Sequence, residues 1–183
     1  MIDKQTYRDA MARLASAVSI VTSDGPAGLC GSTVSAVCSV SDVPPILLVC
    51  INRGSRNNAI LKQNSWLCVN VLRDRQQLLA DQFARSGSSA AQRFSGGNWL
   101  RRNLPEPVLV TGVVSPAPWQ LPALTDALVS LDCKIVETAE LGSHTVFYCA
   151  VEYARFGEPG WPLMYFERGF TRLAGPPATG PAT

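Results

Sequence analysis

The sequence predicts a mainly β fold with a few helices at its periphery. Two observations carry this prediction. Segments in which apolar residues run together or alternate with polar ones recur along the chain, and such segments are typical of strands. Glycine and proline pairs separate several of these segments, as turns between strands require. The predicted strands cover 17–23, 29–41, 46–52, 66–71, 108–114, 129–137, 145–153 and 163–166.

Length and composition favour one domain with extra buried surface. A chain of 183 residues is one domain by the usual size range. We place this domain at 1–174 and predict a disordered tail at 175–183, where Gly, Pro, Ala and Thr offer nothing to bury. Charged residues make up 16% of the chain, against about 25% in typical soluble domains. This low charge predicts a homodimer, and the net charge of +2 argues against a nucleic-acid partner.

The sequence shows no sign of membrane insertion or of metal binding. No apolar run approaches the roughly 18 residues of a membrane span, and the N-terminal residues lack the apolar core of a signal peptide. We therefore expect a cytoplasmic protein. Six cysteines form no C-x-x-C pair and the chain has one histidine, so we predict buried free thiols and no metal site.

The first elements are an amphipathic helix and a hairpin. Residues 3–15 are predicted to form a helix that Asp3 caps, with Tyr7, Met11 and Leu14 along one face. The turn Gly-Pro-Ala-Gly at 25–28 joins the first two predicted strands. The second strand ends at Pro44-Pro45.

The stretch 28–58 carries the strongest functional signal. Over 29–41 hydroxyl side chains such as Thr33 and Ser35 alternate with small apolar ones, so one face of this strand can bind a polar ligand. Ser55 is placed to cap a helix over 55–63, and free N–H groups at a helix start favour an anion. Arg53 and Arg56 add positive charge there. This order suits a phosphorylated planar cofactor.

The middle of the chain is predicted to contribute another helix and a polar segment. A helix over 75–84, capped by Asp74, is predicted to pack through Leu79 and Phe83. The polar segment 85–103 is a candidate flap.

Several motifs occur together in an order that resembles one family. They are R-D-A-M-A-R-L, C-G-S-T-V-S-A-V-C-S-V-S, P-P-I-L-L-V-C-I-N-R, L-C-V-N-V-L, L-G-S-H-T and L-M-Y-F-E-R. From about Tyr7 to Leu173 the chain resembles the small flavin reductase components of two-component monooxygenases, such as the 4-hydroxyphenylacetate 3-monooxygenase reductases. The resemblance implies a flavin-binding split β-barrel, which is a closed Greek-key antiparallel sheet with helices outside, in a homodimer with flavin near the interface. Strand propensity alone leaves a sandwich and a barrel equally open.

The resemblance also implies site residues. The isoalloxazine ring would lie along Thr33, Val34, Ser35, Ala36 and Val37. For the phosphate we select Asn52, Ser55, Arg56 and Asn57, where a helix start, a hydroxyl and a guanidinium can converge. Asn70 and Phe83 match positions near the flavin pocket. His144, the only histidine, and Tyr165 and Arg168 match positions near the nicotinamide. His144 could orient the nicotinamide as a catalytic residue, or could simply bond backbone in a turn.

The implied activity is that of an NAD(P)H:flavin oxidoreductase that supplies diffusible reduced flavin to a separate monooxygenase. We favour FAD over FMN and NADH over NADPH. No G-x-G-x-x-G follows a strand, which argues against a Rossmann crevice. Two alternatives stay open: a protein with tightly bound flavin that passes electrons elsewhere, and a non-enzymatic barrel that binds flavin or heme. A Ser35, His144 and Asp132 triad has no supporting motif.

Overall fold

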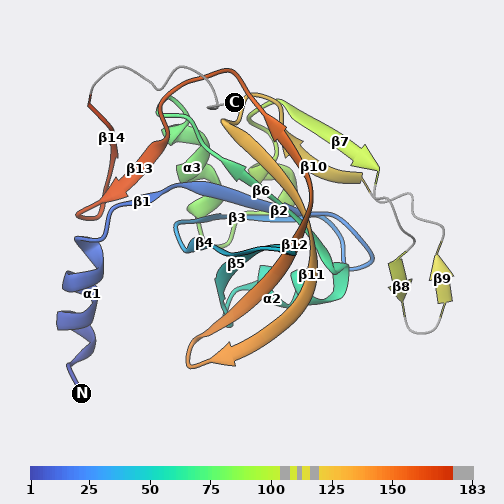
Figure 1. The fold of residues 1–183 in the computed structure, drawn as a ribbon, viewed down its shortest axis with the longest axis horizontal. Coiled ribbons are helices and arrows are strands. Elements are labelled where there is room, and N and C mark those ends of the chain that lie inside the picture. Colours follow the sequence, from blue (N-terminus) through green and yellow to red (C-terminus); the bar gives the residue numbers. More distant parts are fainter. Residues whose placement is uncertain (104–107, 111–112, 116–119, 175–183) are drawn as a thin grey trace.

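A curled antiparallel sheet of seven strands forms the centre of the protein (Figure 1). The structure is a computed structural model, and it describes residues 1–103, 108–110, 113–115 and 120–174. All pairings between the described strands are antiparallel, which confirms the predicted mainly β fold. In spatial order the sheet contains β3 (Cys30–Val34), β2 (Ser19–Ser23), β6 (Trp66–Val71), β11 (Val129–Leu141), β12 (His144–Phe156), β5 (Pro45–Asn52) and β4 (Val37–Asp42).

The two edge strands of this sheet are consecutive in the chain. The single strand predicted over 29–41 is wrong, because the chain leaves β2 after Val34, passes through Ser35 and Ala36, and then pairs with β5. The Cys50 N–H donates to the Ala36 carbonyl over 3.1 Å, which ties the crossing to β5. The short connection through Ser35 and Ala36 therefore keeps the end of β3 close to the start of β4. No ladder joins β3 to β4 in the described part of the chain, so the closed sheet that we expected is an open one.

The hairpin of β11 and β12 is longer than predicted and extends beyond the rest of the sheet. On its β11 side, pairing with β6 covers only Val129 to Lys134. On its β12 side, pairing with β5 runs from His144 to Ala150. A two-residue turn at Gly142 and Ser143 closes the hairpin, and Gly142 has a φ of +54° that favours glycine. The end of β11 is thus a free edge on one side.

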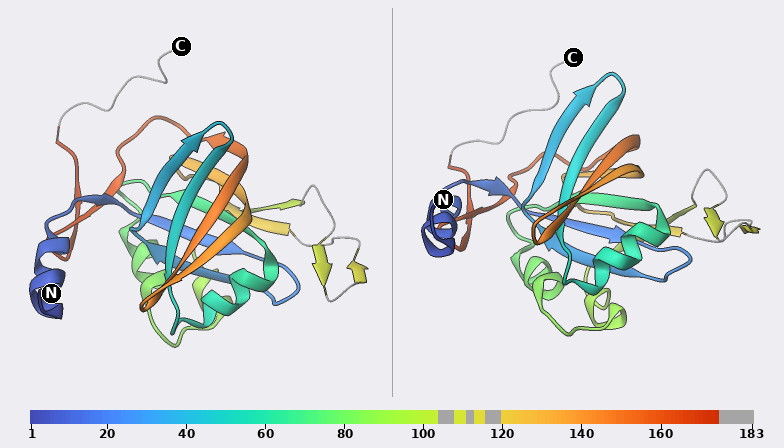
Figure 2. Two further views of the ribbon diagram at one scale, coloured as in Figure 1. Left: turned by 60° about the horizontal axis from the view of Figure 1, so that its bottom comes forward. Right: turned by 90° about the horizontal axis from the view of Figure 1, so that it is seen from below.

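The described residues form four helices, three of which lie against the sheet (Figure 2). Asp3 caps the first helix as predicted, accepting bonds from the N–H groups of Gln5 and Thr6. Ser55 likewise caps the second. The predicted cap at Asp74 is wrong, because the third helix begins after Gln76, which provides no side-chain cap. The helices are α1 (Lys4–Ala12), α2 (Arg56–Asn64), α3 (Gln77–Ala84) and α4 (Ala90–Arg93).

Helix α1 extends away from the sheet (Figures 1 and 2) and buries none of its residues. Its predicted apolar face therefore lies in solvent, where Tyr7 is 55% and Leu14 63% exposed. By contrast, α3 buries Leu79 and Phe83 as expected. No helix among the described residues is both long and apolar enough to span a membrane.

The segment 85–103 carries more structure than its composition suggests. It contains α4 and β7 (Trp99–Asn103), and β7 pairs with β10 (Gln120–Leu124). Phe94 and Trp99 pack against Phe83, with ring centroids 5.0 and 5.4 Å from it. The predicted strand over 108–114 is instead a pair, β8 (Val108–Val110) and β9 (Val113–Ser115), and residues 111–112 lie outside the described residues. The predicted tail at 175–183 also lies outside them.

The last strands return to the start of the chain. Strand β13 (Leu163–Phe166) pairs with β1 (Ser16–Ala17) on one side and β14 (Gly169–Arg172) on the other. The six cysteines are free; Cys38 is exposed and Cys50 partly so, while the other four are buried. Burial raises the pKa of Cys30 to about 12, so this thiol stays protonated. No group of metal-binding side chains occurs among the described residues.

Candidate functional site

Two adjoining cavities form one cleft along the end of β3. Their volumes are about 480 and 630 Å³, and both are lined by Thr33, Val34 and Ser35. These three residues stand where the chain crosses from one edge of the sheet to the other. The first cavity continues towards α3 and the β13–β14 turn, and the second towards the start of α2 and the β11–β12 turn. We call them the α3 cavity and the α2 cavity.

The predicted ring-binding residues divide into two groups. Thr33, Val34, Ser35 and Ala36 line the cleft. The Thr33 hydroxyl donates to the Ala80 carbonyl, which fixes β3 against α3. Val37 is different, because it pairs with Val49 and packs against the core, outside both cavities. The structure therefore does not place Val37 with the other four.

Only part of the group that we selected for a phosphate lines the cleft, because Arg56 and Asn57 line neither cavity. Asn52 and Ser55 line the α2 cavity. The Ser55 hydroxyl accepts from the Asn57 N–H over 3.3 Å, and Asn52 Oδ1 accepts from the Gly54 N–H over 2.7 Å. These bonds shape the turn into a helix start whose free N–H groups favour an anion. Arg56, the first residue of α2, is exposed beside them.

Asn57 plays a different part from the predicted one. Its Nδ2 donates to the Gly31 carbonyl over 2.8 Å and also to the Ser32 hydroxyl. The side chain thus fastens the start of α2 to β3, and it lines neither cavity. Gly31 must be small here, because an added Cβ would stand 2.6 Å from the Phe83 ring.

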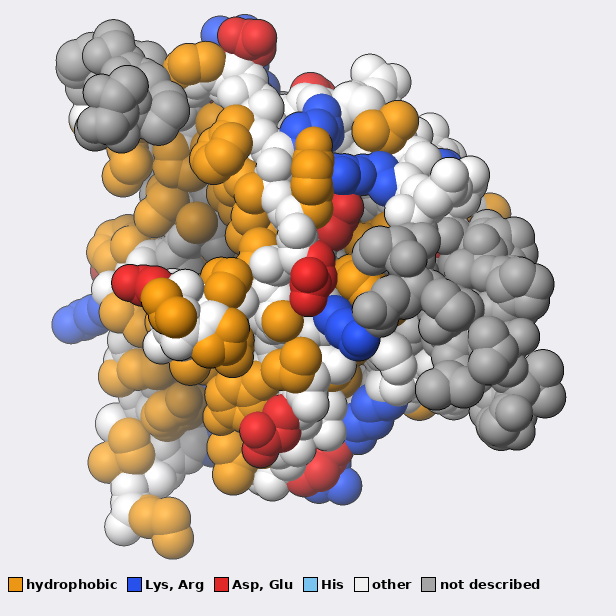
Figure 3. Space-filling view, turned by 45° about the vertical axis from the view of Figure 1, so that its right-hand side comes forward, with side chains coloured by type: hydrophobic (Ala, Val, Ile, Leu, Met, Phe, Trp, Pro, Cys, Tyr) orange, Lys and Arg blue, Asp and Glu red, His pale blue; other side chains and the backbone are white. Residues whose placement is uncertain are grey.

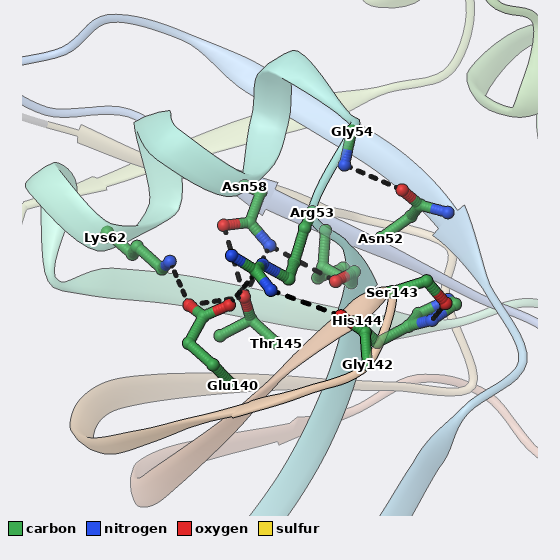
Figure 4. A network of polar contacts seen from close by, with 11 residues as sticks. Asn52, Arg53, Gly54, Asn58, Lys62, Glu140, Gly142, Ser143, His144 and Thr145 are labelled. Carbon is green, nitrogen blue, oxygen red and sulfur yellow. Dashed lines mark hydrogen bonds and ion pairs between the residues drawn. The ribbon is translucent and has the colours of Figure 1, made fainter.

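Arg53 does not contribute the free charge that we expected. Its Nε lies 2.6 Å from Glu140 Oε2, and its Nη1 donates to the Gly142 carbonyl over 3.2 Å (Figure 4). Glu140 also pairs with Lys62. The hydrogen bond from Lys62 holds the pKa of the Glu140 carboxyl below its usual range, with smaller contributions from Thr145 and Arg53. Arg56 is therefore the cation of this loop that stays available to a ligand.

His144 lies at the mouth of the α2 cavity. It opens β12 and pairs across the sheet with Asn52. Its Nδ1 is 2.9 Å from the Ser143 hydroxyl, and its ring is exposed to solvent. Because successive strand residues point to opposite faces, the Glu140–Thr145 pair and the Leu141–His144 pair of the hairpin lie on opposite faces. Figure 4 shows Glu140 on one side of the turn and His144 on the other.

Tyr165 and Arg168 line the α3 cavity, apart from His144. Tyr165 packs against Phe170 with ring centroids 5.5 Å apart. Arg168 has a φ of +62° in the β13–β14 turn and forms an ion pair with Asp9 of α1. That bond lowers the pKa of the Asp9 carboxyl. The two residues therefore join His144 at one cleft, but at its other end.

Asn70 and Phe83 are corrections to the predicted site. Asn70 is fully buried, and its amide oxygen accepts from the Leu124 N–H over 2.7 Å and the Ser130 hydroxyl over 3.0 Å. Its Nδ2 donates to the Ile20 carbonyl. Phe83 is 1% exposed in the aromatic cluster. Both residues are buried in the protein interior, and neither lines the cleft.

Several cleft residues were missed by sequence reasoning. Gln77 and Asp81 of α3 line the α3 cavity, and Tyr7 of α1 lines the α2 cavity. The helical pattern of each segment was visible, but it indicates packing rather than a site. Asp132 lines a separate cavity, where its carboxylate is 3.1 Å from Arg102, so it forms no triad with Ser35 and His144.

Comparisons with known proteins show the family to which the chain belongs. The family model described as "Flavin reductase like domain" matches residues 11–174. A curated relative from Methylorubrum extorquens, named FMN reductase (NADH) RutF, is 46% identical over 99% of this chain and 80% of its own length. A solved structure from Haemophilus somnus, described as a candidate flavin reductase, has a TM-score of 0.80 and 37% identity, and the match covers 94% of this chain and all of that one.

One more solved structure shares the fold at lower identity. It is BorF, described as the flavin reductase component of a bacterial two-component tryptophan halogenase. Its TM-score is 0.78 at 22% identity, and the match covers 95% of this chain and 100% of that one. At this identity the likeness is one of fold.

Proposed function

The chain belongs to the flavin reductase like domain family, and from this membership and the cleft along β3 we propose that it is an NADH-dependent flavin reductase. The observation that carries the proposal is the continuous cleft. It joins a strand with hydroxyl groups, a capped helix start and the only histidine of the chain. A nicotinamide would supply a hydride and a flavin would accept it, so the protein has to hold two ligands together and needs no nucleophile of its own.

The residues of the cleft suit a flavin mononucleotide. Thr33, Ser35 and Ala36 offer hydroxyl and backbone groups to a planar polar ring, and Ser55 and Arg56 offer a helix start and one free cation to a phosphate. The sequence favoured FAD. The relatives are named FMN reductases that use NADH, and this name supports FMN as the flavin and NADH as the reductant. We place the nicotinamide between His144 and Ser35.

We also propose that two copies act together and that reduced flavin leaves the protein for a separate oxygenase. The exposed apolar face of α1 supports the first point. Support for the second comes from the open form of the cleft and from the fold shared with a reductase of a two-component system. A protein that keeps its flavin and passes electrons elsewhere is the competing function.

One set of measurements separates these functions. Purified protein is passed through gel filtration and then mixed anaerobically with NADH and added FMN or FAD. We expect NADH oxidation that requires added flavin, with a higher kcat/KM for FMN. Flavin that stays bound through the column would favour the electron-transfer protein, and binding without NADH oxidation would favour a carrier.

A further inference from the structure

The tip of the β11–β12 hairpin is held in place from outside the sheet. Among the described strands, β12 is the sole sheet neighbour of β11 beyond Lys134, and after the bond from the Ile135 N–H to the Ser65 carbonyl the outer edge of β11 has no strand beside it. His144 stands at this tip and lines the cleft. Any group that fixes the tip therefore also fixes the His144 ring. This reasoning rests on the proposed function, in which His144 faces the nicotinamide.

Arg53 contacts the tip three times. Its N–H donates to the Ser143 carbonyl over 2.9 Å, its Nη1 donates to the Gly142 carbonyl over 3.2 Å, and its Nε pairs with Glu140 over 2.6 Å. The first two contacts hold both residues of the turn that precedes His144. The guanidinium is 53% exposed, so without a partner it would be free to sample other rotamers. The carboxylate of Glu140 is what holds it across the turn.

Glu140 also connects the tip to α2. Its Oε1 accepts from the Thr145 hydroxyl over 3.0 Å and pairs with Lys62 of α2. Thr145 is fully buried and accepts in turn from Asn58 Nδ2 over 2.9 Å (Figure 4). Asn58 lies in the first turn of α2, next to the proposed phosphate site. One carboxylate thus links the turn before His144, the start of β12 and the helix of the phosphate site.

We propose that Glu140 is a positioning residue for the flavin reductase reaction: through Arg53 it sets where His144 stands in the cleft. Glu140 lines neither cavity and points to the face of the hairpin opposite His144. In this proposal Glu140 orients His144 through Arg53 and does not touch the flavin or the nicotinamide. Because Glu140 engages Arg53 and Lys62 in ion pairs, Arg56 is the cation that we propose for the phosphate.

The single histidine makes the proposal directly measurable. Protein without a histidine tag, labelled with ¹⁵N and ¹³C in histidine, gives one set of imidazole signals in an NMR spectrum, and all of them come from His144. Glu140→Ala and Arg53→Gln should each shift and broaden these signals. The double variant should add little to either change, because both residues act through one contact. Glu140→Gln keeps an acceptor and should give a smaller change if Glu140→Ala folds poorly.

The kinetic measurement uses stopped-flow reduction of FMN by NADH without oxygen. Glu140→Ala should slow the reduction or raise its NADH requirement on the order of tenfold, since misplacement of a reacting partner reduces the rate. Binding of FMN, followed by flavin fluorescence, should change less than twofold. Two matched controls are Glu137→Gln, an exposed carboxylate of the same strand, and Lys62→Ala, which removes a partner of Glu140 that does not touch the turn. Both should behave as the wild type.

The outcomes separate the two proposals. Unchanged His144 signals in Glu140→Ala and Arg53→Gln would overturn the positioning role, whatever the activity. An equal loss in Lys62→Ala or Glu137→Gln would overturn the route through Arg53 and indicate a general charge effect. If the wild type reduces no flavin with NADH, the proposed function fails, and the His144 signals still decide whether Glu140 positions the ring.

Discussion

At the scale of single residues, polar side chains near the cleft fall into those that face it and those that support it. Ser55 and Ser35 line the cavities, while Asn57 and Asn70 use their amides within the protein. An amide and a hydroxyl look alike in a sequence as candidate ligand groups. Whether such a side chain is available to a ligand depends on hydrogen-bond partners that are distant in the chain, as Leu124 is for Asn70.

Asn70 gives a direct test of this division. Asn70→Ala removes an acceptor from the Leu124 N–H and the Ser130 hydroxyl and a donor to the Ile20 carbonyl, all of them buried. Each buried polar group left unpaired costs about 1–3 kcal/mol. We expect the free energy of unfolding in urea to fall by about 2–4 kcal/mol. FMN affinity of the folded fraction should stay the same, and a selective loss of flavin binding with normal stability would return Asn70 to the site.

Arg56 should carry the charge that binds the flavin phosphate. A charge-assisted bond contributes about 1.5–3 kcal/mol, so Arg56→Gln should weaken FMN affinity about ten- to hundredfold. The rate of hydride transfer at saturating FMN should be unaffected. Arg75→Gln is the matched control, because it removes an exposed arginine that does not lie next to Ser55 and the start of α2. Equal FMN affinity in the two variants would place the phosphate elsewhere.

His144 is the residue whose role the kinetics decide. If the imidazole orients the nicotinamide, His144→Ala should raise the NADH requirement or slow flavin reduction by about tenfold or more. The melting temperature should barely change, since the ring is exposed and its described contact is with the adjacent Ser143. Stopped-flow reduction and a thermal melt measure the two effects separately. A lower melting temperature with normal reduction would make His144 a turn residue only.

At the scale of elements, ion pairs join the β11–β12 hairpin to the helix beside it. Lys62 donates to Glu140 and lowers the pKa of that carboxyl below its usual value of 4.5. A carboxyl whose pKa is lower in the folded than in the unfolded state stabilises the protein at pH values above its unfolded-state pKa. This contribution is lost as the pH falls through the folded-state pKa. The stability difference between the wild type and Glu140→Gln should therefore be largest above about pH 5 and should shrink towards pH 3.

Urea unfolding of both proteins at several pH values measures this difference. Arg53 and Lys62, the ion-pair partners of Glu140, are both exposed to solvent, so the effect should be small and should weaken further in salt. A difference that grows as the pH falls would show that the folded carboxyl has a raised pKa instead.

The elements themselves show what a sequence can and cannot predict. The bounds of β6 and β13 are as predicted, because polar residues or proline lie close to both ends of these short apolar runs. The cap of α2 at Ser55 was also found locally. The break at Ser35 and Ala36 was missed, since the alternation of side chains continues through it and only the pairing partner changes. Glu140 had no signal in the sequence, because its partners lie 78 and 87 positions away.

At the scale of the whole molecule, the cleft follows from how the sheet is connected. The consecutive strands β3 and β4 form the two edges of the sheet. Ser35 and Ala36 connect them and belong to neither the β2–β3 nor the β4–β5 ladder. The β13–β14 turn approaches the cleft from one side, and the turn of the long hairpin approaches it from the other. Ligand contacts thus come from turns, while the sheet fixes their spacing.

The exposed apolar surface predicts that two copies associate. Tyr7 and Met11 of α1 are 55% and 44% exposed, on a helix that buries none of its own residues, and Leu14, just after the helix, is 63% exposed. On the sheet, Val136 and Phe156 are 52% and 74% exposed. Figure 3 shows many hydrophobic side chains on the left and in the centre of one face of the molecule, with charged side chains along the centre of that face. A soluble monomer rarely leaves so much apolar surface uncovered.

This association can be tested together with the role of α1. Sedimentation equilibrium should give twice the chain mass of 19.7 kDa. Met11→Glu with Leu14→Glu places charges on the exposed apolar residues at and just after the end of α1, and burying them in an interface would be costly, so this variant should sediment as a monomer. Arg8→Glu with Arg13→Glu, which changes charged positions of the same helix, is the control and should stay dimeric. Because Tyr7 of the same helix lines the α2 cavity, loss of the dimer should also weaken FMN binding. A wild-type protein that sediments at 19.7 kDa with full activity would show that one copy is sufficient.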